Sequence, residues 1–339
     1  MVSGPFEDTL VSNAQNGEDI RLMRVLRDRR RGFYVEIGAS DPAQDSISKT
    51  FYDYGWHGII VEPIEELAEA FRQTRVRDKV FQAVCSSRPG KVPFFKVEVP
   101  GVGTGMSTTD PKIADEQAAA GYIVTEKRVQ SLSCDQILEG VERVDFMVID
   151  VEGAEVEVIE SLLQTEVRPD ILVVEAIYPG TQEPSHHQWE LLLLEAGYEY
   201  SAFDGINRFY VSPAAAELKE ELAIPPNVTE NYILATAAAR LIAEAAERAK
   251  LDSELTELKN EVSHLQLLAD FATAESRALR LREHEMRAEA AALSHQARRL
   301  QKRNERLGRE LSSLRSSKPV RLASKVRRTL APIRKRSKA

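Results

Sequence analysis

Four short apolar runs in the first half of the sequence each carry an acidic residue at or next to their carboxyl end. The runs are residues 33–37, 58–62, 145–150 and 171–175, and the acidic residues are Glu36, Glu62, Asp150 and Glu175. A carboxylate can accept hydrogen bonds from hydroxyl groups, bind an amino group or a divalent cation, or take up a proton. The pattern therefore predicts a site where several carboxylates bind a polar ligand.

The same runs predict the elements that would position these carboxylates. Short runs that are apolar throughout are typical of strands buried on both faces of a parallel sheet. Helical patterns lie between them, at residues 64–74, 133–139 and 155–163. Strands that alternate with helices indicate an α/β fold with an open, doubly wound sheet, which binds ligands beyond the carboxyl ends of its strands. All four acidic residues fall at that edge.

The sheet is expected to end in an antiparallel hairpin. Residues 198–203 and 207–211 read as two strands joined by a turn at Asp204 and Gly205.

Two loops of this predicted sheet describe a pocket for a nucleoside. Gly38 follows the first strand and allows a tight turn, but the full G-x-G-x-x-G pattern is missing, which disfavours a dinucleotide or nucleotide-sugar enzyme. Glu62 ends the second strand, 26 residues after Glu36. A carboxylate at that position can accept hydrogen bonds from both hydroxyls of a ribose.

Five segments of the sequence together resemble the FkbM methyltransferase family. They are 15–19 (QNGED), 33–42 (FYVEIGASDP), 55–63 (GWHGIIVEP), 149–155 (IDVEGAE) and 204–210 (DGINRFY). The resemblance runs in order from Ser12 to Val211 and does not reach the sequence beyond. It implies a Rossmann-like class I methyltransferase fold and transfer of a methyl group from S-adenosylmethionine to a hydroxyl, typically on a sugar or a polyketide.

The resemblance also implies which residues bind the cofactor. Glu62 would hold the ribose. Glu36, Gly38 and Asp41 would line the methionine side of the cofactor. The motif that contains Gln15, Glu18 and Asp19 would lie over the pocket as a lid. The complete cofactor-binding set is Gln15, Glu18, Asp19, Glu36, Gly38, Ser40, Asp41 and Glu62.

Methyl transfer to oxygen requires alignment of the acceptor hydroxyl and removal of its proton. The candidate catalytic residues are Asp150, Glu152, Glu175 and His187. Asp150 and Glu175 end two strands, and their oxygen ligands would suit Mg²⁺, which is a hypothesis here. Glu152 is expected to bind substrate hydroxyls. His187 is either a general base or a surface loop residue.

Glu155, by contrast, reads as a residue that starts a helix.

Composition divides the chain into five segments. Both tryptophans, both cysteines and ten of the eleven phenylalanines lie before residue 212, so a packed core is expected only there. The two cysteines are expected to be reduced. The predicted segments are an amino-terminal lid at 1–32, the methyltransferase domain at 33–212, a linker at 213–240, a coiled coil at 241–316 and a basic amphipathic tail at 317–339.

The coiled coil is predicted from two seams of residues with a spacing of seven. The first consists of Leu251, Leu258, Leu265, Ala272, Leu279, Met286, Leu293, Leu300, Leu307 and Leu314. The second consists of Leu255, Val262, Ala269, Ser276, Glu283, Ala290, Ala297, Asn304 and Leu311. Such seams predict a homodimer or a partner helix, with Asn304 as a residue that sets the register of a parallel dimer. The alternative is a single charged helix that associates only in part.

The basic tail suggests a membrane surface as a partner. Nine Lys or Arg residues and no acidic residue lie between Ser316 and Ala339, whereas the whole chain has a net charge of −8. Apolar residues alternate with these charges, and no aromatic residue that would stack on bases is present there, so an anionic membrane is favoured over nucleic acid. No signal peptide or transmembrane run is recognised, which predicts a cytoplasmic protein at the inner face of a membrane.

Two functions remain as hypotheses. The first is an S-adenosylmethionine-dependent O-methyltransferase that acts on a hydroxyl of a sugar or glycan, such as a surface polysaccharide. The second is a catalytically degenerate Rossmann-like platform, whose coiled coil and basic tail serve as a scaffold in a glycan-assembly complex.

Overall fold

The computed structural model describes residues 9–101 and 103–316. The chain divides into two compact units between Glu244 and Ala245, and each is described by itself. The predicted basic tail at 317–339 lies outside the described residues.

A seven-stranded sheet forms the centre of the first unit, with the strand order β10-β11-β9-β8-β2-β3-β4. Strands β2, β3, β4, β8 and β9 are parallel, β11 is antiparallel to β9, and β10 is antiparallel to β11. This arrangement confirms the doubly wound sheet with a terminal hairpin. The strands are β2 Phe33–Ile37, β3 His57–Val61, β4 Lys79–Phe81, β8 Phe146–Ile149, β9 Ile171–Glu175, β10 Glu199–Phe203 and β11 Asn207–Val211.

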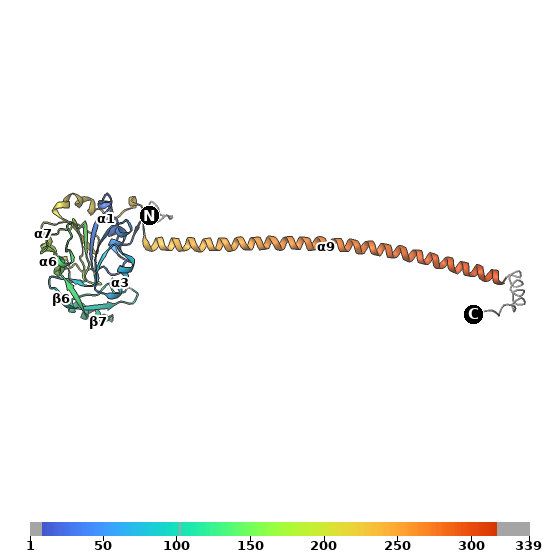
Figure 1. The fold of residues 1–339 in the computed structure, drawn as a ribbon, viewed down its shortest axis with the longest axis horizontal. Coiled ribbons are helices and arrows are strands. Elements are labelled where there is room, and N and C mark those ends of the chain that lie inside the picture. Colours follow the sequence, from blue (N-terminus) through green and yellow to red (C-terminus); the bar gives the residue numbers. More distant parts are fainter. Residues whose placement is uncertain (1–8, 102, 317–339) are drawn as a thin grey trace, which may run out of the picture. The chain divides into compact units, whose positions relative to one another are not determined.

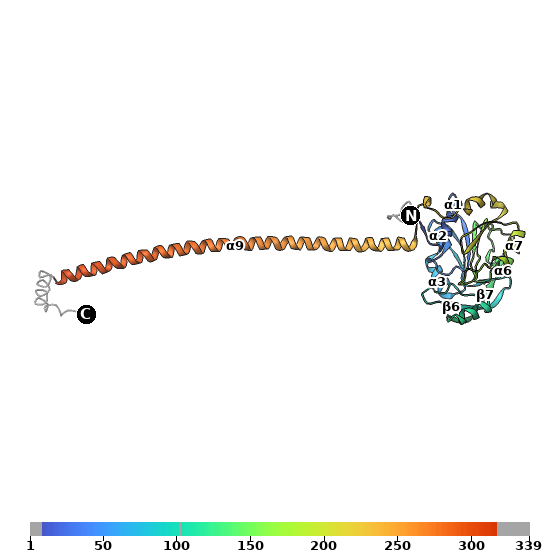
Figure 2. The same ribbon diagram turned by 180° about the vertical axis from the view of Figure 1, so that it is seen from behind.

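Helices cover both faces of this sheet, because alternate strand residues are apolar on each side. Val35 packs with the helices α5 (Cys134–Ile137), α6 (Glu155–Leu163) and α7 (Glu190–Glu195). Figure 1 shows α6 and α7 on one side of the sheet and α1 and α3 on the other, and Figure 2 shows the same arrangement from behind.

The opposite face packs against three earlier helices. Tyr34, the neighbour of Val35, contributes to this second core. The helices are α1 (Glu18–Leu26), α2 (Ile47–Asp53) and α3 (Glu65–Thr74).

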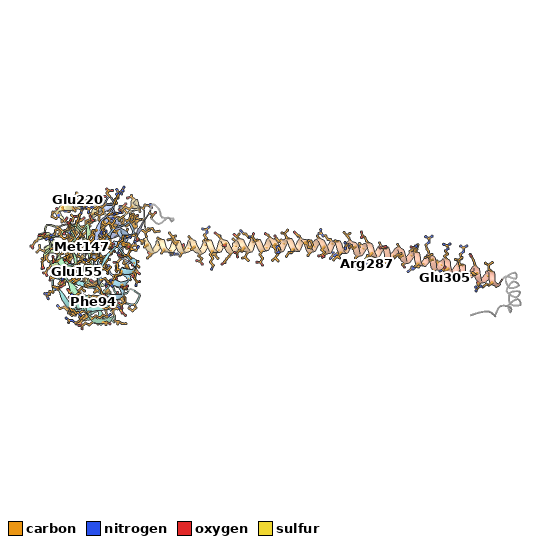
Figure 3. The ribbon with its side chains drawn as sticks, viewed as in Figure 1. Phe94, Met147, Glu155, Glu220, Arg287 and Glu305 are labelled. Atoms are coloured by element: carbon orange, nitrogen blue, oxygen red, sulfur yellow. The ribbon has the colours of Figure 1, made fainter. Side chains whose placement is uncertain are left out.

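A second, three-stranded sheet follows β4 in the chain and has the order β5-β7-β6. Its strands are β5 (Val84–Cys85), β6 (Gly90–Glu98) and β7 (Ile123–Leu132), and helix α4 (Pro111–Ala119) lies between the last two in sequence. Phe94 of β6, labelled in Figure 3, is buried.

The segment expected to be a linker, 213–240, is folded onto the first unit instead. It contains η2 (Pro213–Leu218), α8 (Lys219–Ala223), η3 (Val228–Glu230) and β12 (Tyr232–Leu234). Strand β12 pairs in parallel with β1 (Leu10–Ser12). Arg24 of α1 donates hydrogen bonds to the carbonyl oxygens of Glu221 and Ile224 and to the carboxylate of Glu230, at 2.9, 2.6 and 2.6 Å.

A chain that ends after Pro226 is therefore expected to be less stable than one that ends after Glu244. The shorter chain loses the β1–β12 pair and the ion pair between Arg24 and Glu230. Because each hydrogen bond contributes about 1 kcal/mol, we expect the free energy of unfolding to fall by about 2–4 kcal/mol. Urea unfolding of the two truncated chains measures this difference, and equal midpoints would show that β12 adds no stability.

Helix α9 spans Ala235–Ser316 and begins six residues before the predicted start at 241. Its side chains project on all sides, Arg287 and Glu305 among them (Figure 3). Within residues 9–101 and 103–316, no helix combines the length and the apolar character needed to cross a membrane.

Candidate functional site

A pocket with a volume of about 250 Å³ opens at the carboxyl ends of β2, β3 and β8. The polar part of its lining includes Ser40, Glu62, Asp150 and Glu152, and Phe94 from the three-stranded sheet contributes apolar surface. In the main sheet β3 is the neighbour of β2 on one side, and β8 is its neighbour on the other side. The pocket therefore lies at the point where the strand order reverses, which is where open α/β sheets bind ligands.

Gly38 lines this pocket at the point where the loop after β2 meets the loop after β8. Its φ is +81°, and a Cβ at this position would lie 1.7 Å from the backbone carbonyl oxygen of Asp150. The amide of Asp150 in turn donates a hydrogen bond of 3.0 Å to the carbonyl of Ile37. Glycine is thus required here because the loop after β8 approaches the loop after β2, a constraint that comes from the protein itself.

Glu62 is held in the pocket by two backbone amides. Its Oε2 accepts a hydrogen bond from Ser40 N at 2.9 Å, and its Oε1 accepts one from Ile64 N at 2.8 Å. Only 3% of the residue is exposed. Burial raises the pKa of Glu62 to about 7, although both amides favour the charged form. Each oxygen has a second lone pair with which it can accept a hydrogen bond from a ligand.

Two of the predicted cofactor residues, Glu36 and Asp41, lie outside the described lining of the pocket. Glu36 is buried, accepts hydrogen bonds from the hydroxyls of Ser46 and Ser48, and lies 4.0 Å from a guanidinium nitrogen of Arg75. The Oδ1 of Asp41 accepts hydrogen bonds from the backbone amides two and three residues later, both at 2.8 Å. Both side chains thus shape the loop between β2 and α2, and their contact with a cofactor stays a prediction.

Arg75 fixes the same loop from the other side, and sequence reasoning missed it. The side chain is 1% exposed and donates hydrogen bonds to Pro42 O, Ser46 Oγ and Ser48 Oγ at 2.9, 2.7 and 2.6 Å. It follows α3 in a stretch rich in exposed charges, so nothing in the local sequence distinguishes it.

The predicted lid motif is built into the fold. Gln15 is exposed, whereas Glu18 and Asp19 are buried at the start of α1, and none of the three belongs to the described pocket lining. Glu18 Oε1 accepts a hydrogen bond of 2.9 Å from Asn207 Nδ2, and Asn207 is the residue of β11 that pairs with Glu175. Burial raises the pKa of Glu18 to about 7, and the nearby Asp204 adds to the effect.

Asp19 accepts hydrogen bonds from Ser12 Oγ at 2.7 Å and from Asn13 N at 2.8 Å. The motif therefore connects α1 to β11 next to the end of β9, and its role as a lid stays a prediction.

Three carboxylates meet beyond the ends of β8 and β9. One oxygen from each of Asp150, Glu152 and Glu175 lies within 4.8 Å of the others. The Oε2 atoms of Glu152 and Glu175 are buried and have no hydrogen-bond partner among residues 9–101 and 103–316. Burial raises the pKa of all three groups, and the charge of Asp150 raises those of Glu152 and Glu175 further. The cluster can therefore retain protons at neutral pH or bind a cation in their place.

The backbone holds Glu152 in an unusual conformation. Its φ is +53° and that of Gly153 is +100°. The hydroxyl of Thr108, which is 1% exposed, donates a hydrogen bond of 2.7 Å to the carbonyl oxygen of Glu152. Left-handed conformations of residues other than glycine are uncommon and concentrate at functional sites. Thr108 was not predicted, because it lies 44 residues before its partner in the sequence.

Two other candidates fall outside the cluster. Glu155 is the first residue of α6, as expected, and its Oε1 accepts a hydrogen bond of 3.0 Å from Gly153 N. His187 is exposed in the 3₁₀ helix η1 (His186–Gln188) and is not part of the described pocket lining. Nothing in this position connects His187 to the three carboxylates, and its role as a base stays a prediction.

Comparison with known proteins agrees with this geometry. A family model described as "Methyltransferase FkbM domain" matches residues 36–200, a range that contains Glu62, Asp150, Glu152 and Glu175. No curated protein matches the chain. The chain therefore contains a domain of the FkbM methyltransferase family and is, by that domain, a methyltransferase.

Proposed function

We propose that the protein transfers a methyl group from S-adenosylmethionine to a hydroxyl group of a sugar or glycan. Glu62 is the observation that carries the cofactor assignment. Two backbone amides fix its carboxylate at the end of the second strand of the doubly wound sheet, inside the pocket. Both oxygens keep acceptor capacity, so Glu62 can bind the two adjacent hydroxyls of a ribose. When bound, S-adenosylmethionine supplies an electrophilic methyl group.

The acceptor hydroxyl must lose its proton, and the three carboxylates are in a position to take it. Asp150 and Glu152 line the same pocket as Glu62, and Glu175 adjoins them. A buried carboxylate with a raised pKa is a better base than an exposed one, because its pKa is closer to neutral pH. Thr104 and Ser107 add hydroxyl groups to the lining, which suits a polar acceptor.

We further propose that Asp150, Glu152 and Glu175 bind a divalent cation such as Mg²⁺. The proposal that these residues fit a cation rests on two buried oxygens, Glu152 Oε2 and Glu175 Oε2. Both lack a hydrogen-bond partner among the described residues. Oxygen ligands are those that Mg²⁺ prefers, and a bound ion would lower the pKa of an acceptor hydroxyl. The competing arrangement is a proton shared between Asp150 and Glu175.

A surface polysaccharide that is assembled at the inner face of a membrane is the acceptor that we propose, with the protein in the cytoplasm. The basic sequence between residues 317 and 339 would then bind the anionic membrane.

Replacing Glu62 by glutamine tests the cofactor assignment. The amide group places an N–H₂ opposite the N–H of Ser40 or of Ile64, so one of the two holding contacts becomes a contact between donors. We expect the affinity for S-adenosylhomocysteine, measured by calorimetry, to fall roughly 10- to 100-fold, which corresponds to the loss of one charged hydrogen bond.

Glu65→Gln is the matched control, because Glu65 is an exposed carboxylate of α3 outside the described pocket lining. If Glu62→Gln binds as tightly as the control, Glu62 does not hold the ribose. If the folded wild type binds no S-adenosylhomocysteine at all, the degenerate platform becomes the better account of this domain.

A further inference from the structure

The leucine seam of α9, defined as the ten positions from Leu251 to Leu314 with a spacing of seven, is exposed to solvent along the helix. From Leu251 to Leu307 each of its members is classed as exposed, with Leu251 57% and Leu307 45% exposed. The second seam, which lies four residues after each leucine-seam position, exposes Leu255 and Val262 in the same way. An 82-residue helix with a continuous apolar stripe requires something that covers the stripe.

The residue types in the two seams fit a second helix of the same kind. Leucine occupies eight of the ten positions of the leucine seam, and Asn304 occupies a position in the second seam. In a heptad these seams are the d and a positions, respectively. Leucine at d with a β-branched residue such as Val262 at a favours two parallel strands, and an asparagine at a is best placed opposite an identical asparagine. In an antiparallel pair Asn304 would face an apolar d residue.

The charges that flank the seams distinguish parallel from antiparallel pairing. Between residues 251 and 315, the e positions, which directly follow the leucine seam, contain one acidic residue, Asp252, and four basic residues. The basic residues are Lys259, Arg280, Arg287 and Arg315. The g positions, which directly precede the second seam, contain five glutamates and two arginines. These are Glu254, Glu261, Glu275, Glu289 and Glu310, with Arg282 and Arg303.

Parallel, in-register helices bring each g position next to the e position that lies five residues further along the other chain. Glu254 then faces the partner's Lys259, Glu275 faces the partner's Arg280, and Glu310 faces the partner's Arg315. Antiparallel helices would instead place g opposite g and e opposite e, so that glutamates face glutamates and basic residues face basic residues. From Glu254 to Arg315, the flanking charges therefore complement each other better in the parallel arrangement than in the antiparallel one.

The layer around Glu283, in the middle of the helix, contains like charges. Arg282 at g would face the partner's Arg287 at e, which is repulsive. Glu283, at the a position between them, lies 2.5 Å from Arg287 of its own helix and offers a negative charge to each of these arginines. The layer thus contains two glutamates and four arginines in the pair, a weak polar centre between two stronger apolar ends.

We propose that α9, from Leu251 to Leu314, pairs with the same segment of a second copy of this chain as a parallel, in-register, two-stranded coiled coil. This inference is independent of the methyltransferase activity, because it rests only on the seams and on the charges that flank them.

Disulfide crosslinking of the full chain tests orientation and register. Leu258→Cys and Leu307→Cys place a cysteine at a d position near each end of the segment, and Asn260→Cys and Arg309→Cys place it two residues later, at f positions that face outward. Mild oxidation is expected to crosslink each d variant to itself and to leave both f variants monomeric on a denaturing gel. In an antiparallel dimer neither end meets itself, so failure of both d variants to crosslink overturns the proposal.

The native cysteines do not interfere, because Cys85 and Cys134 are buried next to each other in the first unit.

Charge reversal in the full chain tests the pairing of flanking residues. One variant carries Glu254→Lys, Glu275→Lys and Glu310→Lys, and the other carries Lys259→Glu, Arg280→Glu and Arg315→Glu. Each variant alone turns six attractive pairs per dimer into repulsive ones, and we expect dimer affinity at low salt to fall roughly a hundredfold. A mixture of the two is expected to form heterodimers with restored affinity.

Analytical ultracentrifugation measures all three samples and the wild type. A wild type that stays monomeric at micromolar concentration, or that forms trimers, overturns the proposal. So does a glutamate-reversed variant that dimerises as well as the wild type, because that result requires a pairing in which g does not meet e.

Discussion

Alanine at position 38 is expected to abolish the pocket and to destabilise the first unit severely. The new Cβ would lie 1.7 Å from the carbonyl oxygen of Asp150 and 2.8 Å from its carbonyl carbon, and both are backbone atoms. Neither can retreat without breaking the hydrogen bond between Asp150 N and Ile37 O, which continues the ladder between β2 and β8. We expect the free energy of unfolding to fall by at least about 4 kcal/mol, a loss typical of severe backbone conflicts.

Gly55→Ala is the matched control for this experiment. Gly55 also has a positive φ, +91°, but apart from its two chain neighbours no described residue has an atom within 4 Å of an added Cβ. Its substitution therefore measures the conformational cost alone, which is about 1 kcal/mol. Urea unfolding and calorimetric titration with S-adenosylhomocysteine compare the two variants. If Gly38→Ala is as stable as Gly55→Ala, the close approach of the two loops does not matter.

Asparagine at position 150 is expected to remove the proposed cation site. Asp150 lines the pocket, belongs to the three-carboxylate cluster and directly follows the end of β8. We expect the affinity for Mn²⁺, which serves as a probe for Mg²⁺, to fall at least about 100-fold, because loss of a direct ligand exceeds the 10- to 100-fold effect of losing a supporting residue. Methyl transfer is expected to fall with it.

Glu157→Gln is the control, since Glu157 lines the pocket but lies outside the cluster and is exposed.

The pH dependence of Mn²⁺ binding adds a second readout. Burial raises the pKa values of Glu152 and Glu175, so both groups hold protons at a pH where exposed carboxylates are charged. A cation must displace these protons, and its affinity therefore increases as the pH rises. Tighter binding at pH 8 than at pH 6 is expected. A wild type that binds no Mn²⁺ even at pH 8 would leave the shared proton as the correct description of the cluster.

The central sheet could be predicted from sequence because its signals are local. Each strand is a short apolar run with turn residues beside it, and the alternation of helix and strand determines the fold class. The pairing of β1 with β12 could not be predicted in this way, since Leu10 and Tyr232 lie at opposite ends of the unit and each strand has only three residues. The proline pair at 225–226 suggested a linker, but side chains of α1 bind the carbonyls around it.

The site was predicted in part for the same reason. The acidic residues at strand ends were found because parallel strands bring their carboxyl ends to one edge, and two of them, Asp150 and Glu175, do meet there together with Glu152. Glu36 lies one residue before the end of its run, and its side chain points to the face of α1, α2 and α3 and pairs with Arg75. Sequence periodicity gives the edge at which a residue lies, but the partner of a buried charge depends on contacts that are distant in the chain.

The pairing of β1 with β12 has a consequence for how the protein is made. Leu10 leaves the ribosome 222 residues before its partner Tyr232. Domains fold as they are synthesised, from the amino terminus onward, but this strand has to wait until the rest of the sheet has formed. Synthesis has entered α9 by the time β1 can pair. The amino-terminal strand is therefore among the last parts of the methyltransferase unit to become ordered on the nascent chain.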